Sequence, residues 1–136
     1  MTAEELLELA SKKGHSVLRF DLPENKSLSV EDGNCFIGLD FRLGYAEEKE
    51  CLAHELGHCE YGGFYNHYSG LDVREKAERR ANKWAFLHLA PVGKIMQVVQ
   101  NGINDTWELA ECLETTDGFT SMALQFYQDA GIVFDK

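Results

Sequence analysis

The 136-residue sequence is poor in features that would mark a linker, a membrane span or a repeat. It has only two prolines, no low-complexity tract and no internal repeat. It also lacks any run of about 18 apolar residues, so no membrane-spanning helix is expected. A chain of this length can bury roughly two-thirds of its unfolded surface. The sequence therefore predicts one domain, residues 1–136, built around its own core.

Basic charge is also scarce, because 13 Lys and Arg stand against 23 Asp and Glu, for a net charge of −10. This balance opposes nonspecific attraction to phosphate backbones or anionic lipid. It suits a neutral or basic protein partner, although solubility is the simpler explanation. The first ten residues are acidic and amphipathic, without the basic start and apolar run of a signal peptide. We expect a cytoplasmic protein with no membrane contact.

The most informative segment is His54-Glu55-Leu56-Gly57-His58, the H-E-x-x-H pattern of zinc peptidases. The run before it contains no Gly or Pro, which predicts a helix over 46–61 that ends near Gly62. On a helix, residues four apart differ by about 40° in rotation, so both imidazoles can reach one ion. Glu55 lies about 100° around from His54, where a carboxylate can take a proton from the attacking water.

Two features of the same segment leave alternatives open. Gly57 costs about 1 kcal/mol of helix propensity relative to Ala, which suggests that another backbone or a substrate strand comes close. The pattern is short, and His54 and His58 could be two surface histidines of an amphipathic helix. A third ligand on a neighbouring helix or strand would favour a metal site over two surface histidines.

A catalytic zinc typically has three protein ligands and one open position. We expect a second helix over 73–90, ended by Pro91. Glu78 lies on its small, mostly apolar stripe, where a carboxylate is costly unless it is paired or bound to metal. Glu75 is the alternative ligand, but Arg79 at i+4 offers it a surface ion pair. The pattern therefore favours Glu78.

Several segments form a combined pattern: Leu52-Ala53-His54-Glu55-Leu56-Gly57-His58, Glu78-x-x-Ala81-Asn82-x-Trp84-Ala85 and Leu89-x-Pro91, with further segments at Leu22-Pro23, 33–40 and 107–111. Together they resemble the motifs of the ImmA/IrrE family of metallo-endopeptidases. Trp84 stands where Phe is usual, and His88 and Ala90 replace apolar residues, but none of these is a predicted ligand. The resemblance implies a minimal zincin-like fold, Zn²⁺ bound by His54, His58 and Glu78, and Glu55 as general base.

The resemblance also implies a substrate. Short members of the family resemble proteases of phages and mobile elements that cleave or inactivate a helix-turn-helix repressor. We therefore expect a zinc-dependent endopeptidase with a narrow protein substrate, such as a transcriptional repressor. Two other classes stay open: a zinc-stabilised antirepressor that acts by association without cutting, and a DNA-binding regulator. The sequence leaves the oligomeric state undetermined.

The expected fold class is α+β. After an opening helix over 3–13, short alternating runs over 15–21, 27–31 and 35–40 predict three strands. Asp32-Gly33 between the last two is a hairpin signal, so we expect a small, mostly antiparallel three-stranded sheet packed on the H-E-x-x-H helix. The segment 35–40 is the expected free edge, where an extended substrate would bind by strand addition.

The glycine-bounded, aromatic segment 62–71 joins the two ligand-bearing helices. Tyr65, His67 and Tyr68 in it are candidates to donate hydrogen bonds to the oxyanion of a tetrahedral intermediate. For any single one of them, plain loop packing is the favoured interpretation. His67 as a metal ligand is less favoured, because the two helices already supply three ligands.

We expect residues 1–91 to form the catalytic core and residues 92–136 to form a helical C-terminal part. Helices are expected over 92–100, 105–114 and 117–130, with caps at Asn104-Asp105 and Thr116-Asp117. This part has two basic and seven acidic residues, whereas DNA binding normally needs several Lys or Arg side chains. Packing or a protein partner, without direct nucleic-acid contact, is the favoured role.

The four cysteines show no C-x-x-C spacing, so free thiols in a reducing cytoplasm are the simplest expectation. Cys51 and Cys59 share the predicted helix of the H-E-x-x-H motif and could in principle compete for zinc. Buried small hydrophobic side chains are the favoured interpretation for both.

Overall fold

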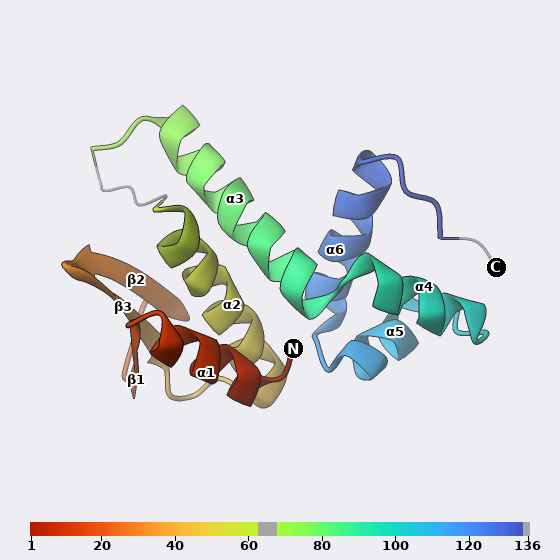
Figure 1. The fold of residues 1–136 in the computed structure, drawn as a ribbon, viewed down its shortest axis with the longest axis horizontal. Helices are drawn as coiled ribbons and strands as arrows, with labels where there is room; N and C mark the ends of the chain where they lie inside the picture. The colour runs from red at the N-terminus through yellow and green to blue at the C-terminus, as the bar shows by residue number, and fades with distance from the viewer. Residues whose placement is uncertain (63–67, 135–136) are drawn as a thin grey trace.

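The computed structural model of this chain describes residues 1–62 and 68–134, and the architecture there is α+β (Figure 1). Six helices and three strands occur in these ranges, each within two residues of its predicted ends. In chain order they are α1 (Ala3–Lys12), β1 (Ser16–Phe20), β2 (Ser27–Asp32), β3 (Asn34–Asp40), α2 (Tyr45–Tyr61), α3 (Leu71–Leu89), α4 (Val92–Gln100), α5 (Thr106–Leu113) and α6 (Asp117–Asp129).

The sheet is mixed, with strand order β1-β3-β2. β2 and β3 form the predicted antiparallel hairpin, and Gly33 at its turn has a φ of 77°, which favours glycine. β1, however, pairs with β3 in parallel, so the expectation of a mostly antiparallel sheet is wrong. The chain after β1 crosses to the far edge before it forms β2, and local turn chemistry contains no signal for that crossing.

This strand order corrects a second expectation, that residues 35–40 form a free edge. β3 is the central strand and is hydrogen-bonded on both sides, so it cannot accept a further strand. It is also the strand with the most buried side chains, including Cys35, Ile37 and Leu39 on its inward face. The free edges belong to β1 and β2.

Helices α2 and α3 lie side by side, and α2 packs against this sheet and α1 (Figure 1). A Cβ added at Gly57 would lie 2.8 Å from both the Cα and the carbonyl oxygen of Ala81. The close backbone approach predicted from this glycine is thus confirmed, and it is made by α3. Buried residues of α1, β3, α2 and α3 form one apolar cluster, which includes Leu6, Ile37, Leu39, Leu52, Leu56 and Trp84.

The C-terminal helices pack around a second apolar cluster, which includes Phe86, Ile95, Leu109, Leu113 and Tyr127. α3 contributes to both clusters and so connects the two parts. No helix within residues 1–62 and 68–134 is both long and apolar enough to cross a membrane.

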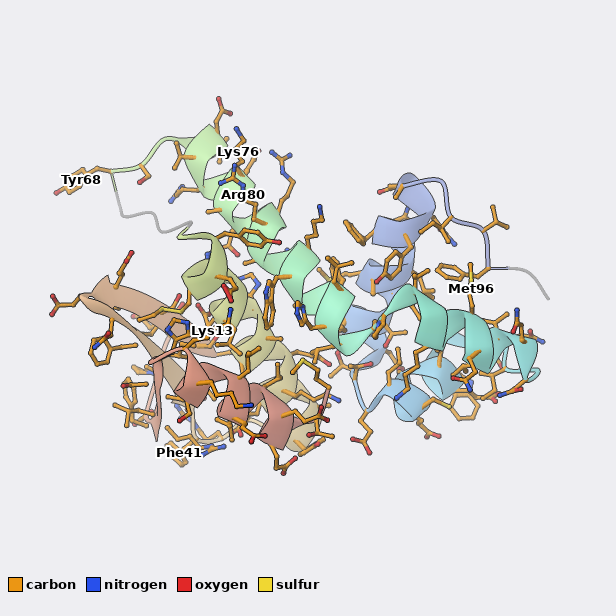
Figure 2. The ribbon with its side chains drawn as sticks, viewed as in Figure 1. Lys13, Phe41, Tyr68, Lys76, Arg80 and Met96 are labelled. Atoms are coloured by element: carbon orange, nitrogen blue, oxygen red, sulfur yellow. A yellow bond between two sulfur atoms is a disulfide. The ribbon has the colours of Figure 1, made fainter. Side chains whose placement is uncertain are left out.

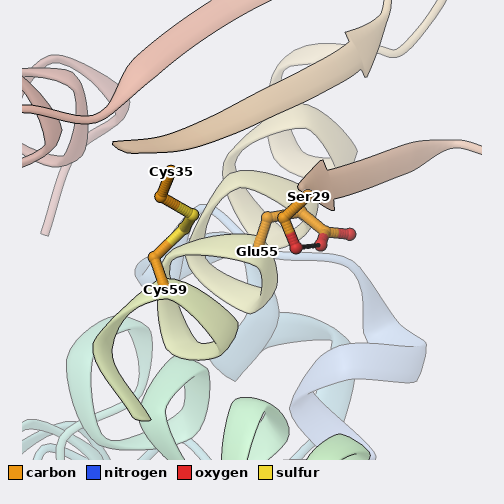
Figure 3. The surroundings of a disulfide bond; sticks show 4 residues. All are labelled: Ser29, Cys35, Glu55 and Cys59. Carbon is orange, nitrogen blue, oxygen red and sulfur yellow. Dashed lines mark hydrogen bonds between the residues drawn. A yellow bond between two sulfur atoms is a disulfide. The ribbon is translucent and has the colours of Figure 1, made fainter. Parts of the chain in front are cut away.

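A disulfide joins Cys35 of β3 to Cys59 of α2 (Figure 3). The expectation of four free thiols is therefore wrong for this pair, whereas Cys51 and Cys112 are free. The alternation of β3 turns Cys35 inward, toward the end of α2 that carries Cys59. These cysteines are 24 residues apart, and their meeting depends on the packing of α2 on the sheet.

Candidate metal centre

Three predicted ligands meet between α2 and α3. His54 and His58 lie one helical turn apart on α2, and α3 brings Glu78 against both. Nε2 of His54 is 2.8 Å from one carboxylate oxygen of Glu78, and Nε2 of His58 is 3.1 Å from the other. The potential ligand atoms of the three residues all lie within 4.8 Å of one another. This group is therefore able to hold a metal ion.

Asn82, one turn after Glu78 on α3, orients the His54 ring. Its Oδ1 lies 2.8 Å from Nδ1 of His54, and because this oxygen can only accept, Nδ1 carries the proton. In the neutral imidazole, Nε2 then has a free lone pair, directed at the carboxylate of Glu78. A lone pair facing a carboxylate is stable only with a positive centre between them, either a proton or a metal ion. The donor set thus fits a cation.

The surroundings of His54 favour positive charge. Burial disfavours the imidazolium, but the hydrogen bond to Glu78 and the negative charges of Glu55 and Glu78 outweigh it, so the pKa of His54 is raised. The same field that attracts a proton also attracts a metal cation.

Glu55 is buried, with 6% of its surface exposed, and faces β2. Ser27 Oγ donates to one of its carboxylate oxygens at 2.6 Å, and Ser29 Oγ donates to the other at 2.7 Å. Figure 3 shows the Ser29 contact close to the disulfide. Glu55 therefore lies beside the metal-binding group and also anchors β2 to α2.

Sequence reasoning assigned no role to Asn82, Ser27 or Ser29. For Asn82 a signal was available, because Glu78 and Asn82 are four apart and share a helix face. For the serines the available signal is their alternate spacing in a short strand, which places both on one face. Which element that face meets depends on the strand order, and the sequence did not predict that order.

The alternative ligand Glu75 is not part of the metal-binding group in the described residues. It is exposed and lines an open cavity of about 450 Å³ beside the centre, together with Leu71, Arg74, Glu78, Arg79 and Asn82. The ion pair expected between Glu75 and Arg79 does not occur among the described contacts. This cavity gives access to the carboxylate of Glu78 from solvent.

Of the three candidate oxyanion donors, Tyr65 and His67 lie outside the described residues. Tyr68 is 92% exposed, and its side chain points away from the two ligand helices (Figure 2). The described structure therefore does not bring Tyr68 to the centre.

The described residues hold one other group with metal-ligand geometry, formed by His15, Cys35 and Cys59. Its two sulfurs are joined in the disulfide and are not available as thiolates, the form that binds metals. Cys51 belongs to neither group. The competition for metal that Cys51 and Cys59 could have offered is therefore absent from the described centre.

No protein-family model matches this chain, and no curated protein matches it in sequence. The resemblance to the ImmA/IrrE family therefore rests on the quoted motifs alone. Independently of any similarity to another protein, the geometry shows that two imidazoles and a carboxylate converge between two packed helices.

Proposed function

We propose that this protein is a zinc-dependent endopeptidase of minimal zincin-like fold, which hydrolyses a peptide bond in a specific protein. The convergence of His54, His58 and Glu78, with Asn82 fixing the His54 ring, is the observation that carries this proposal. The family resemblance suggests the substrate class, a helix-turn-helix repressor of a phage or mobile element, and a cytoplasmic setting.

In this proposal the chain's residues have separate tasks. Nε2 of His54, Nε2 of His58 and the carboxylate of Glu78 hold Zn²⁺, and Asn82 orients His54. When bound, the ion would polarise the peptide carbonyl and acidify a water molecule. Glu55 would take the proton of the attacking water and pass it to the leaving amine. Each oxygen of Glu55 accepts one serine hydrogen bond and keeps a second lone pair for this proton, so Ser27 and Ser29 hold the carboxylate in position.

The edge strand that would hold an extended substrate is β2, since β3 is central. β2 carries the two serines that contact Glu55, so a peptide added to its free side would pass close to the base. Hydrogen exchange can test this: amides of β2 should gain protection when a peptide binds. Unchanged exchange in β2 with a bound peptide would remove this part of the proposal.

Metal content of the protein purified without added metal tests the centre itself. We expect about one zinc per chain in the wild type and in Glu75→Ala, and strong loss in Glu78→Ala. Glu75→Ala is the matched control, because Glu75 is an exposed carboxylate one turn before Glu78 on the same helix. A wild type that binds no zinc after supplementation would overturn the proposal.

The alternative is a zinc-stabilised antirepressor that acts by association. The two serine hydrogen bonds to Glu55 favour it, because they give this carboxylate a structural task that needs no catalysis. Glu55→Gln separates the two functions, with zinc content and repressor activity measured on the same preparation. Loss of repressor inactivation with zinc retained supports hydrolysis, whereas retention of both supports association.

A further inference from the structure

The basic residues of this acidic chain are concentrated on one helix. Five of its 13 Lys and Arg lie within ten residues of α3, and all five are exposed: Arg74, Lys76, Arg79, Arg80 and Lys83. Basic side chains elsewhere are mostly paired, as in Arg19 with Glu48 and Lys26 with Glu47. None of the five α3 residues takes part in an ion pair among the described residues.

Four of the five, all except Arg74, border a groove of about 570 Å³ between α3 and α6. Its apolar floor consists of Phe86 from α3 with Met122 and Phe126 from α6. Met122 is 52% exposed and Phe126 is half-buried, whereas Phe86 is buried, so the floor is open to solvent mainly at Met122. Lys76 and Arg80 stand on the α3 side of the groove (Figure 2). The acidic residue at its border, Asp129, accepts a hydrogen bond from Gln125 at 2.8 Å.

The groove adjoins the cavity beside the metal centre. Arg79 and Asn82 line both hollows, and Asn82 also contacts His54. A molecule bound in the groove would therefore lie next to the entrance of the proposed active site.

We propose that this groove docks an acidic, amphipathic segment of the protein substrate. Apolar side chains of the segment would cover Met122 and Phe126 above the buried Phe86, and its carboxylates would pair with the basic residues at the border, such as Lys76 and Arg80. A nucleic acid could use the basic border but would leave the apolar floor uncovered, whereas an amphipathic segment matches both. The identity of this segment as part of the substrate rests on the proposed function. Its binding in the groove does not.

Fluorescence anisotropy with a defined probe tests the docking. The probe is a labelled helix-forming peptide of about 15 residues, with Leu and Phe at i, i+3, i+4 and i+7 and Glu elsewhere. The protein is the full chain with Glu55→Gln, so that the probe stays intact. We expect saturable binding that weakens with salt. Any binding of a matched peptide with Lys in place of Glu should not depend on the groove residues.

Two groove variants and one control locate the binding. Arg80→Glu and Met122→Asp should each weaken the peptide about tenfold or more, whereas Lys94→Glu should not. Lys94 is exposed on α4, outside the groove, and its substitution makes the same charge change as Arg80→Glu. Circular dichroism confirms that each variant is folded.

The groove proposal is overturned if the acidic peptide does not bind or if the groove variants bind as well as the wild type. It is also overturned if a DNA duplex of the same charge competes for the groove more strongly than the peptide. Glu78→Ala separates this result from the proposed function. That variant should lose zinc and still bind the peptide, so either proposal can fail while the other stands.

Discussion

The two halves of α2 both carry buried polar residues, but these residues are satisfied in different ways. In the first half, Lys49 is 2% exposed and donates to the carbonyl of Leu113 at 2.9 Å. Beside it, Glu50 accepts from the backbone N–H of Thr116 at 2.6 Å and from its hydroxyl at 2.8 Å. These contacts fasten the turn between α5 and α6 to α2.

In the second half, His54 and His58 direct Nε2 atoms at the same carboxylate, that of Glu78. The neutral His54 tautomer that Asn82 favours leaves Nε2 as an acceptor facing this carboxylate, which calls for a cation. Lys49 and Glu50 already have complementary partners in Leu113 and Thr116. Burial of a polar group therefore does not by itself mark a functional site. The two halves differ in whether each donor meets an acceptor and each acceptor meets a donor.

The largest expected effect is on stability and belongs to the first half. Lys49→Ala leaves a cavity and an unpaired carbonyl at Leu113, and should lower the free energy of unfolding by about 2–4 kcal/mol. Zinc content should stay at the wild-type level, because Lys49 has no contact with the centre. Denaturant unfolding and metal analysis of the same variant check both points. Loss of zinc from a folded Lys49→Ala would contradict the assignment of a structural role to the first half of α2 and metal binding to the second.

Gly57→Ala tests whether the second half depends on the close approach of α3. The added Cβ would meet Ala81 backbone atoms at 2.8 Å and force the helices apart, at a cost of about 1–3 kcal/mol. Zinc affinity should fall as well, because His58 and Glu78 lie on opposite sides of this contact. Gly93→Ala in α4 is the control, since its Cβ would meet nothing within 4 Å. Equal unfolding energies in Gly57→Ala and wild type would contradict the packing argument.

Asn82→Ala removes the partner that fixes the His54 ring. Loss of such an orienting contact typically weakens metal binding about 10–100-fold. Competition with a chelator of known affinity measures this effect, and Glu75→Ala, on the same helix, should leave the affinity unchanged. If Asn82→Ala binds zinc as tightly as the wild type, the contact with His54 is structural only.

The smallest effect concerns the charge of Glu50. Burial raises its pKa above the ordinary value of 4.5, although the hydrogen bonds from Thr116 act in the opposite direction. Because the folded state holds the proton more tightly, this group contributes stability below pH 4.5 that is lost as pH rises through the folded pKa. Replacement by Gln should therefore flatten the decline of stability just above that pH. Thermal unfolding in a pH series compares Glu50→Gln with wild type, and identical slopes would show that Glu50 does not titrate in this range.

Local sequence signals predicted the elements and the ligands of the centre. Hydrophobic periodicity, glycines and caps gave each helix and strand within two residues, and the spacing of His54 and His58 gave two ligands on one helix face. Glu78 could be chosen over Glu75 because it lies on the small, mostly apolar stripe of its own helix. The family resemblance supplied the same three residues and an expected chemistry, which the experiments on zinc content and cleavage test.

The tertiary structure decided everything that depends on which distant segments meet. It placed β3 between β1 and β2, made β2 the edge beside Glu55, and joined Cys35 to Cys59. It also brought Lys49 and Glu50 of α2 into hydrogen bonds with Leu113 and Thr116, and it formed the basic groove between α3 and α6. A helix face or a turn follows from neighbouring residues, because backbone geometry repeats over a few positions. Contacts between segments instead depend on the packing of the whole chain, which no local pattern encodes.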